Sequence, residues 1–109
     1  MSTDQYPKNQ VVQLGQSVEY AENSIVSKAI IKSRPGNITL FAFDEGQELS
    51  EHTAPFDALV QVLDGTVEIK IADDRHTLEK GSGIIMPADI PHAVKAVKRF
   101  KMLLTMIKE

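Results

Sequence analysis

Two histidines, His52 and His92, are the side chains of this sequence best suited to chemistry. An imidazole titrates near neutral pH, so it can exchange protons, and its nitrogens are common metal ligands. The third histidine, His76, follows a turn and is expected on the surface. The 109-residue chain has no cysteine, which excludes a thiolate nucleophile and a disulfide framework. The residue types therefore favour metal or ligand binding, or proton transfer, by two imidazoles.

The composition is that of an ordinary globular domain, with 42% hydrophobic and 25% charged residues and a net charge of -3. The basic residues near the carboxyl terminus should be divided between two strand faces and lack an aromatic stacking platform, so no nucleic-acid partner is expected. The polar amino terminus lacks a secretory signal, and no apolar stretch is long enough to cross a bilayer. We expect a cytoplasmic protein without a membrane partner.

Turn-forming residues recur at short, regular intervals, which is typical of an all-β sandwich or barrel. We expect a mobile arm over residues 1–10 and one β-barrel domain over residues 11–109. The predicted turns are Arg34 to Asn37, Asp44 to Gly46, Asp64-Gly65, Asp73-Asp74, Gly81 to Gly83 and Pro87 to Asp89.

The segment Thr66 to Ile71 alternates apolar and polar residues, as a strand with one buried face should. Asp64-Gly65 precedes it directly, and this pair favours the positive φ angles of a tight hairpin turn. The pattern predicts that Val62-Leu63 and Thr66-Val67 belong to two antiparallel neighbouring strands.

The last predicted strand, Phe100 to Ile107, has apolar residues on both faces, including Met102 on one and Leu103 on the other. Both faces should therefore be covered. Either an amino-terminal strand around Val11 and Val12 or a second subunit could cover the second face, and we predict a homodimer.

Two spaced sets of residues resemble the motifs of the cupin superfamily, specifically small single-domain barrels of the conserved cupin 2 type. The resemblance implies an all-β, double-stranded β-helix (jelly-roll) barrel with a ligand or metal site inside it. The first motif is matched at Gly46, His52 and Gly65, and the second at Gly81, Pro87 and His92.

The sequence departs from these motifs at three positions. Ala54 replaces the family's second histidine, Ala58 replaces its glutamate, and Asp89 replaces a glycine. Strand alternation should direct the remaining histidines and several small or branched apolar residues into the barrel. The predicted ligand pocket is lined by His52, Ala54, Ala58, Val60, Val62, His92 and Val94.

Two imidazoles alone hold a divalent metal ion weakly, because catalytic zinc sites take three protein ligands and many iron sites add a carboxylate. A third ligand could be Glu48, which alternation places on the same strand face as His52. It could also be Asp57 if its loop bends inward, or Gln61 if its strand is bulged. The expected cofactor is therefore none, or iron, manganese, nickel or zinc bound by His52 and His92.

Three functions follow from these residues. The first is a barrel that binds a small organic ligand without catalysis, as a sensor or carrier. The second is a metal-dependent cupin enzyme, a dioxygenase, decarboxylase or isomerase, acting on a small acid or sugar. The third is acid or base catalysis by the histidines without a metal.

Overall fold

The computed structural model describes residues 6–108, and within them the chain is almost entirely β-structure. One short 3-10 helix precedes the strands, so no helix in this part of the chain is long enough to span a membrane. The elements are η1 (Leu14–Gln16), β1 (Ile25–Lys32), β2 (Gly36–Phe43), β3 (Glu48–His52), β4 (Ala58–Ile71), β5 (Asp74–Glu79), β6 (Gly83–Met86) and β7 (His92–Ile107).

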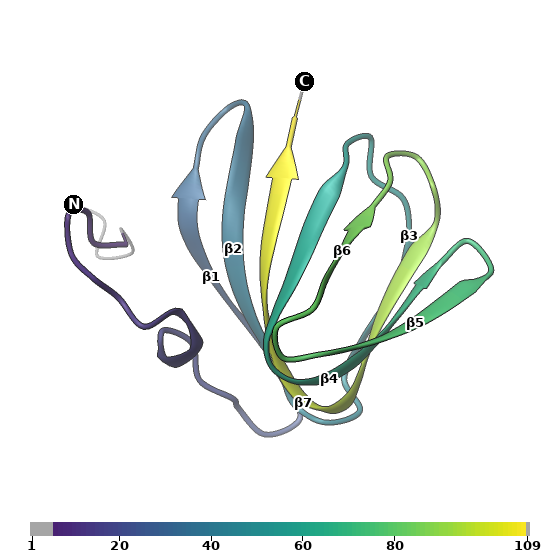
Figure 1. Cartoon of the computed structure of the whole chain (residues 1–109), viewed down its shortest axis with the longest axis horizontal. Helices are drawn as coiled ribbons and strands as arrows, with labels where there is room; N and C mark the ends of the chain where they lie inside the picture. The colour runs from purple at the N-terminus through teal and green to yellow at the C-terminus, as the bar shows by residue number, and fades with distance from the viewer. Residues whose placement is uncertain (1–5, 109) are drawn as a thin grey trace.

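All seven strands belong to one antiparallel sheet that folds over on itself (Figure 1). The first half has the order β1-β2-β7-β4-β6, and the second half has the order β3-β7-β4-β5. The long strands β4 and β7 run through both halves and bend together at the bottom of the picture. This arrangement confirms the predicted all-β jelly-roll barrel.

The prediction of a hairpin at Asp64-Gly65 is wrong. Both residues lie inside β4, which pairs with β7 before and after them, and the pairing register shifts on each side. Gly65 has a φ of 78°, and a Cβ atom at this position would overlap the backbone oxygen of Arg99 in β7. The Asp-Gly pair therefore produces a bulge and a bend in one long strand, because only glycine allows the two backbones to approach so closely.

The other predicted turns are confirmed, since each separates two strands. Inward-facing residues of both halves pack into one core that includes Phe43 and Phe100, whose ring centroids are 4.6 Å apart. The predicted two-sided burial of the last strand is also confirmed, because Met102 lies in this core while Leu103 contacts a second cluster on the outside of the sheet.

This second cluster, which we name the outer cluster, is formed by the amino-terminal segment and the outer face of the first half. Val18 is buried against Leu40 and Ala42 of β2. The segment therefore covers the second face of β7 at Leu103, although it forms no strand, and Val11 is 95% exposed. Residues 1–5 of the predicted mobile arm lie outside the described residues, whereas Tyr6 contacts the outer cluster.

Tyr20 fastens this segment to the sheet. Its hydroxyl donates a 2.6 Å hydrogen bond to Oδ2 of Asp64, and burial together with this bond raises the pKa of Tyr20. Arg99 and Lys101 lie over its ring at 5.1 and 4.8 Å from the centroid, a cation–π arrangement. Lys101 also donates a 2.6 Å hydrogen bond to the backbone oxygen of Gly15. The segment is thus held by polar contacts as well as by its apolar residues.

Replacement of Gly65 by alanine tests the role of the close approach between β4 and β7. We expect Gly65→Ala to lower the free energy of unfolding by at least about 3 kcal/mol, because the new Cβ atom forces the two backbones apart. Urea denaturation measures this change. The matched control is Gly46→Ala, since Gly46 also has a positive φ, 84°, but has open space where a Cβ atom would lie. The control should lose only about 1 kcal/mol, and equal losses in the two variants would contradict the interpretation.

Candidate functional site

The structure brings His52 and His92 together. His52 is the last residue of β3, His92 is the first residue of β7, and the two are partners in the pairing register of these strands. Their ring centroids are 4.4 Å apart, with an interplanar angle of 68°. The chain thus places two imidazoles edge to face at one end of the sheet.

Backbone carbonyl groups orient both rings in the same way. Nδ1 of His52 lies 2.8 Å from the oxygen of Ser50, and Nδ1 of His92 lies 3.2 Å from the oxygen of Ile90. A carbonyl oxygen only accepts hydrogen bonds, so each Nδ1 carries the proton. Each neutral ring therefore has an unprotonated Nε2, whose lone pair is available to a hydrogen-bond donor or a metal ion.

The two rings differ in exposure. His52 is exposed, whereas His92 is only 5% exposed and is the one polar residue among the buried side chains of residues 6–108. Burial lowers the pKa of His92 below its ordinary value of 6.5, and the nearby His52 lowers it further, while the hydrogen bond to Ile90 acts in the opposite direction. His92 is consequently neutral at neutral pH.

The other residues predicted to line the pocket lie deeper. Ala58, Val60, Val62 and Val94 all belong to the hydrophobic core and are at most 4% exposed. Ala54 lies instead in the loop after β3, where its oxygen accepts a 2.7 Å hydrogen bond from the backbone N–H of Asp89. The histidine pair thus stands at the edge of a packed core.

The three candidates for a third metal ligand are placed elsewhere. The register of β3 shifts between Leu49 and His52, so Leu49 rather than Glu48 faces the core, and Glu48 is paired with Lys95. Oδ1 of Asp57 accepts a 2.8 Å hydrogen bond from the backbone of Ala88. Gln61 is exposed on β4, between the buried residues Val60 and Val62.

The donor set does not complete a metal site of the usual kind. Within residues 6–108, no three histidine, cysteine, aspartate or glutamate side chains are grouped closely enough to hold a metal ion. The two histidine Nε2 atoms are the protein ligands that remain for a metal ion, one fewer than catalytic zinc sites use.

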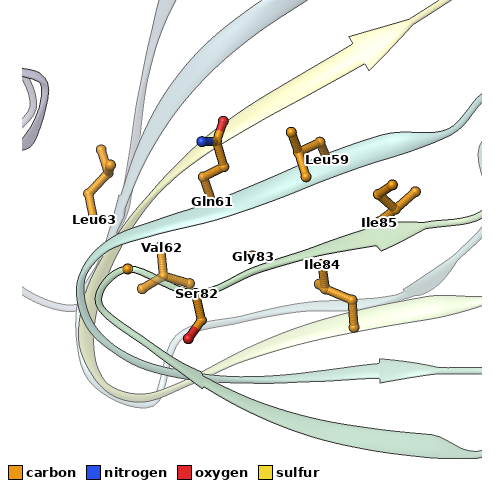
Figure 2. A pocket seen from close by; sticks show the side chains of 9 residues that line it. Leu59, Gln61, Val62, Leu63, Ser82, Gly83, Ile84 and Ile85 are labelled. Carbon is orange, nitrogen blue, oxygen red and sulfur yellow. The ribbon is translucent and has the colours of Figure 1, made fainter.

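Sequence reasoning missed a hollow of about 690 Å³ beside β4 and β6, which is lined by residues from both faces of the sheet (Figure 2). Leu59, Gln61 and Leu63 of β4 border it, together with Ile85 of β6. The signal was present in the sequence. Once Ala58, Val60 and Val62 face inward, alternation places Leu59 and Leu63 on the outside, where two leucines on one strand are unusual.

A family model for the cupin domain matches residues 39–107, a range that includes both histidines. This chain belongs to the cupin family. The prediction from the two motifs is therefore confirmed. A search of curated protein sequences found no match.

Solved structures agree with this assignment. A conserved protein of unknown function from Streptococcus pyogenes is 36% identical, with a TM-score of 0.91, over 100% of this chain and 96% of that one. A cupin superfamily protein from Desulfitobacterium hafniense is 30% identical, with a TM-score of 0.90, over 95% of both chains. A cupin 2 conserved barrel domain protein from Leptotrichia buccalis is 40% identical, with a TM-score of 0.83, over 86% of this chain and 46% of that one.

The backbone explains which motif residues this cupin retains. Gly46, Gly65 and Gly81 have φ angles of 84°, 78° and 92°, in the region that favours glycine. Asp89, which replaces a motif glycine, has a φ of 63°, and aspartate is one of the few other residues that adopt this conformation readily. The retained glycines and Asp89 thus follow the backbone geometry of the turns and the bend.

The pKa of His92 predicts how stability depends on pH. Because His92 binds its proton less readily in the folded than in the unfolded chain, its contribution to stability is full above about pH 6.5 and is lost as the pH falls below that value. We expect the free energy of unfolding to decrease from pH 7 to pH 5 less steeply in a His92→Gln variant than in the parent protein. Urea denaturation at each pH measures both slopes, and identical slopes would contradict the burial of a neutral His92.

Proposed function

We propose that this cupin binds a small organic ligand at the histidine pair, as a sensor or carrier rather than as a catalyst. The observation that carries the proposal is the orientation of the two rings, since both Nδ1 atoms donate to backbone carbonyls and both Nε2 atoms are left as acceptors. Two acceptors on adjacent rings form a directional polar contact of the kind that fixes a ligand in a mostly apolar site.

The chemistry of the pair defines the class of ligand. A neutral His92 accepts a hydrogen bond through Nε2 and donates none there, so its partner must carry a hydroxyl, amino or amide N–H group. Its register neighbour on the other side is Ile71 of β4, which packs against the core. The expected ligand is therefore small, partly apolar and equipped with at least one hydrogen-bond donor.

The exposures of the two rings suggest the direction of entry. His52 is exposed and His92 is buried, so a ligand approaching from solvent meets His52 first. The two ring centroids are 4.4 Å apart, so a ligand that contacts His52 also lies close to His92. Exposed side chains change rotamer readily, and His52 is held by the single hydrogen bond to Ser50.

A second candidate is a metal-dependent cupin enzyme, and the same ring orientation favours it. Metal-binding histidines usually donate their other ring N–H to a carbonyl or carboxylate, as His52 and His92 do. A divalent ion would supply Lewis acidity for an oxygen-containing substrate. The described residues offer it two ligands and no grouped carboxylate, so the ligand-binding function is the better supported of the two.

A ligand screen tests the proposed function. Small hydroxyl-bearing and amino-bearing compounds are added to metal-free protein, and thermal unfolding is measured. A ligand present at one hundred times its dissociation constant should stabilise the protein by about 2.7 kcal/mol. We expect the stabilisation to disappear in His52→Ala and His92→Ala and to persist in His76→Ala, whose histidine is exposed on β5 and serves as the matched control. A hit that survives both pair variants would refute a site at these rings.

The same variants distinguish a metal-dependent enzyme from a ligand-binding protein. Elemental analysis of protein purified without an affinity tag or chelator should show well under one divalent ion per chain, because two imidazoles bind such ions weakly. A stoichiometric ion in the parent and in His76→Ala, lost from both pair variants, would favour the metalloenzyme instead.

A further inference from the structure

Two loops flank the histidine pair. The first loop, residues 53–57, follows His52 and leads into β4, and the second loop, residues 87–91, leads from β6 to His92. The two loops lie side by side at the top of Figure 1. Each histidine is therefore attached directly to one of the loops, and the shape of the loops bears on the site.

Two hydrogen bonds join the loops, and both donors belong to the second loop. The backbone N–H of Asp89 donates to the oxygen of Ala54 at 2.7 Å. The backbone N–H of Ala88 donates to Oδ1 of Asp57 at 2.8 Å. A carboxylate forms a stronger hydrogen bond with an N–H group than a neutral oxygen does. The side chain of Asp57 is thus a strong link between the two loops.

The second loop depends on contacts with residues outside it. It contains Pro87 and Pro91, which have no backbone N–H to donate. Asp89 has a φ of 63°, a left-handed conformation that persists where neighbouring contacts fix it. At the end near β7, the oxygen of Pro91 accepts a 2.8 Å hydrogen bond from the N–H of Ala72. The first loop holds the second loop at its other end.

The shape of the second loop decides the orientation of His92. Nδ1 of His92 donates to the oxygen of Ile90, which lies inside this loop. Nδ1 of His52 donates instead to the oxygen of Ser50, which lies in β3 and outside both loops. A change in the second loop should therefore affect the ring of His92 and leave the orientation of His52 unchanged.

We propose that Asp57 is a positioning residue for the ligand site. By holding Ala88, its carboxylate fixes the loop in which the carbonyl of Ile90 keeps the proton of His92 on Nδ1. Nε2 of His92 is then available to the ligand. Asp57 acts through the loop and not by contact with the ligand or with a metal ion. The inference rests on the proposed function, because it concerns the affinity of the same site.

Histidine side-chain nitrogen NMR of variants at position 57 tests this role. Asp57→Ala removes the acceptor, so His92 should change from the Nδ1–H tautomer to a mixture of both tautomers, whereas His52 should keep the Nδ1–H form. Asp57→Asn retains an oxygen acceptor and should preserve the spectrum of the parent protein. Asp73→Ala is the matched control and should also preserve it, since Asp73 is exposed in the turn between β4 and β5.

Hydrogen exchange of the Ala88 N–H shows whether the second loop has been released. Exchange should be at least about tenfold faster in Asp57→Ala than in the parent protein, because the amide loses its acceptor. Asp57→Asn should restore slow exchange. An unchanged tautomer of His92 despite faster exchange at Ala88 would overturn the positioning role. Equal changes at His52 and His92 would also overturn it, because they would indicate a general loss of structure, which circular dichroism detects independently.

Ligand affinity separates this inference from the proposed function. A compound that binds the parent protein should bind Asp57→Ala about tenfold more weakly, and it should bind Asp57→Asn and Asp73→Ala nearly as tightly as the parent. Equal affinity for all of these proteins would refute the positioning role and leave the proposed function standing. If no compound binds the parent, the proposed function fails, and the NMR comparison still decides whether Asp57 positions His92.

Discussion

The pairing of β4 with β7 is the constraint on which the rest of the structure depends. These two strands lie side by side through both halves of the sheet, and each remaining strand except β1 pairs with one of them. The sheet closes around a core only because both strands bend at the same place, where Gly65 lets the backbone of β4 approach Arg99. A side chain at this position would separate the halves and expose the apolar residues between them.

The site and the outer face are consequences of this pairing. Because β7 begins at His92 and pairs there with both β3 and β4, one imidazole is set between His52 and Ile71. The local backbone then orients each ring through a carbonyl two residues earlier in the chain. On the outside of the sheet, the same registers pair Leu40 with Leu103, where the amino-terminal segment contacts both. One strand pair thereby positions a polar contact at the edge of the core and the outer cluster on the other face.

Alternation and motif spacing in the sequence were sufficient to predict the barrel, the inward-facing valines of β4 and the proximity of the two histidines. They could not distinguish a hairpin at Asp64-Gly65 from a bend in one strand, because the positive φ of Gly65 suits both and the choice depends on the distant residue Arg99. The prediction that Glu48 lies on the same face of its strand as His52 was wrong for a similar reason, since the register of β3 shifts where it pairs with β7. Alternation of apolar and polar residues predicts which side chains share a face of a strand. Bulges depend on the strand that pairs with it, which can lie far away in the sequence.

The central claim is that both histidines offer an unprotonated Nε2 to a ligand, and histidine side-chain nitrogen NMR at neutral pH measures it most directly. The spectra should show the Nδ1–H tautomer for His52 and for His92, as their hydrogen bonds to Ser50 and Ile90 require. Addition of a binding compound should then shift both Nε2 signals and leave that of His76 unchanged. An Nε2–H tautomer at either ring, or a charged His92 at neutral pH, would contradict the account.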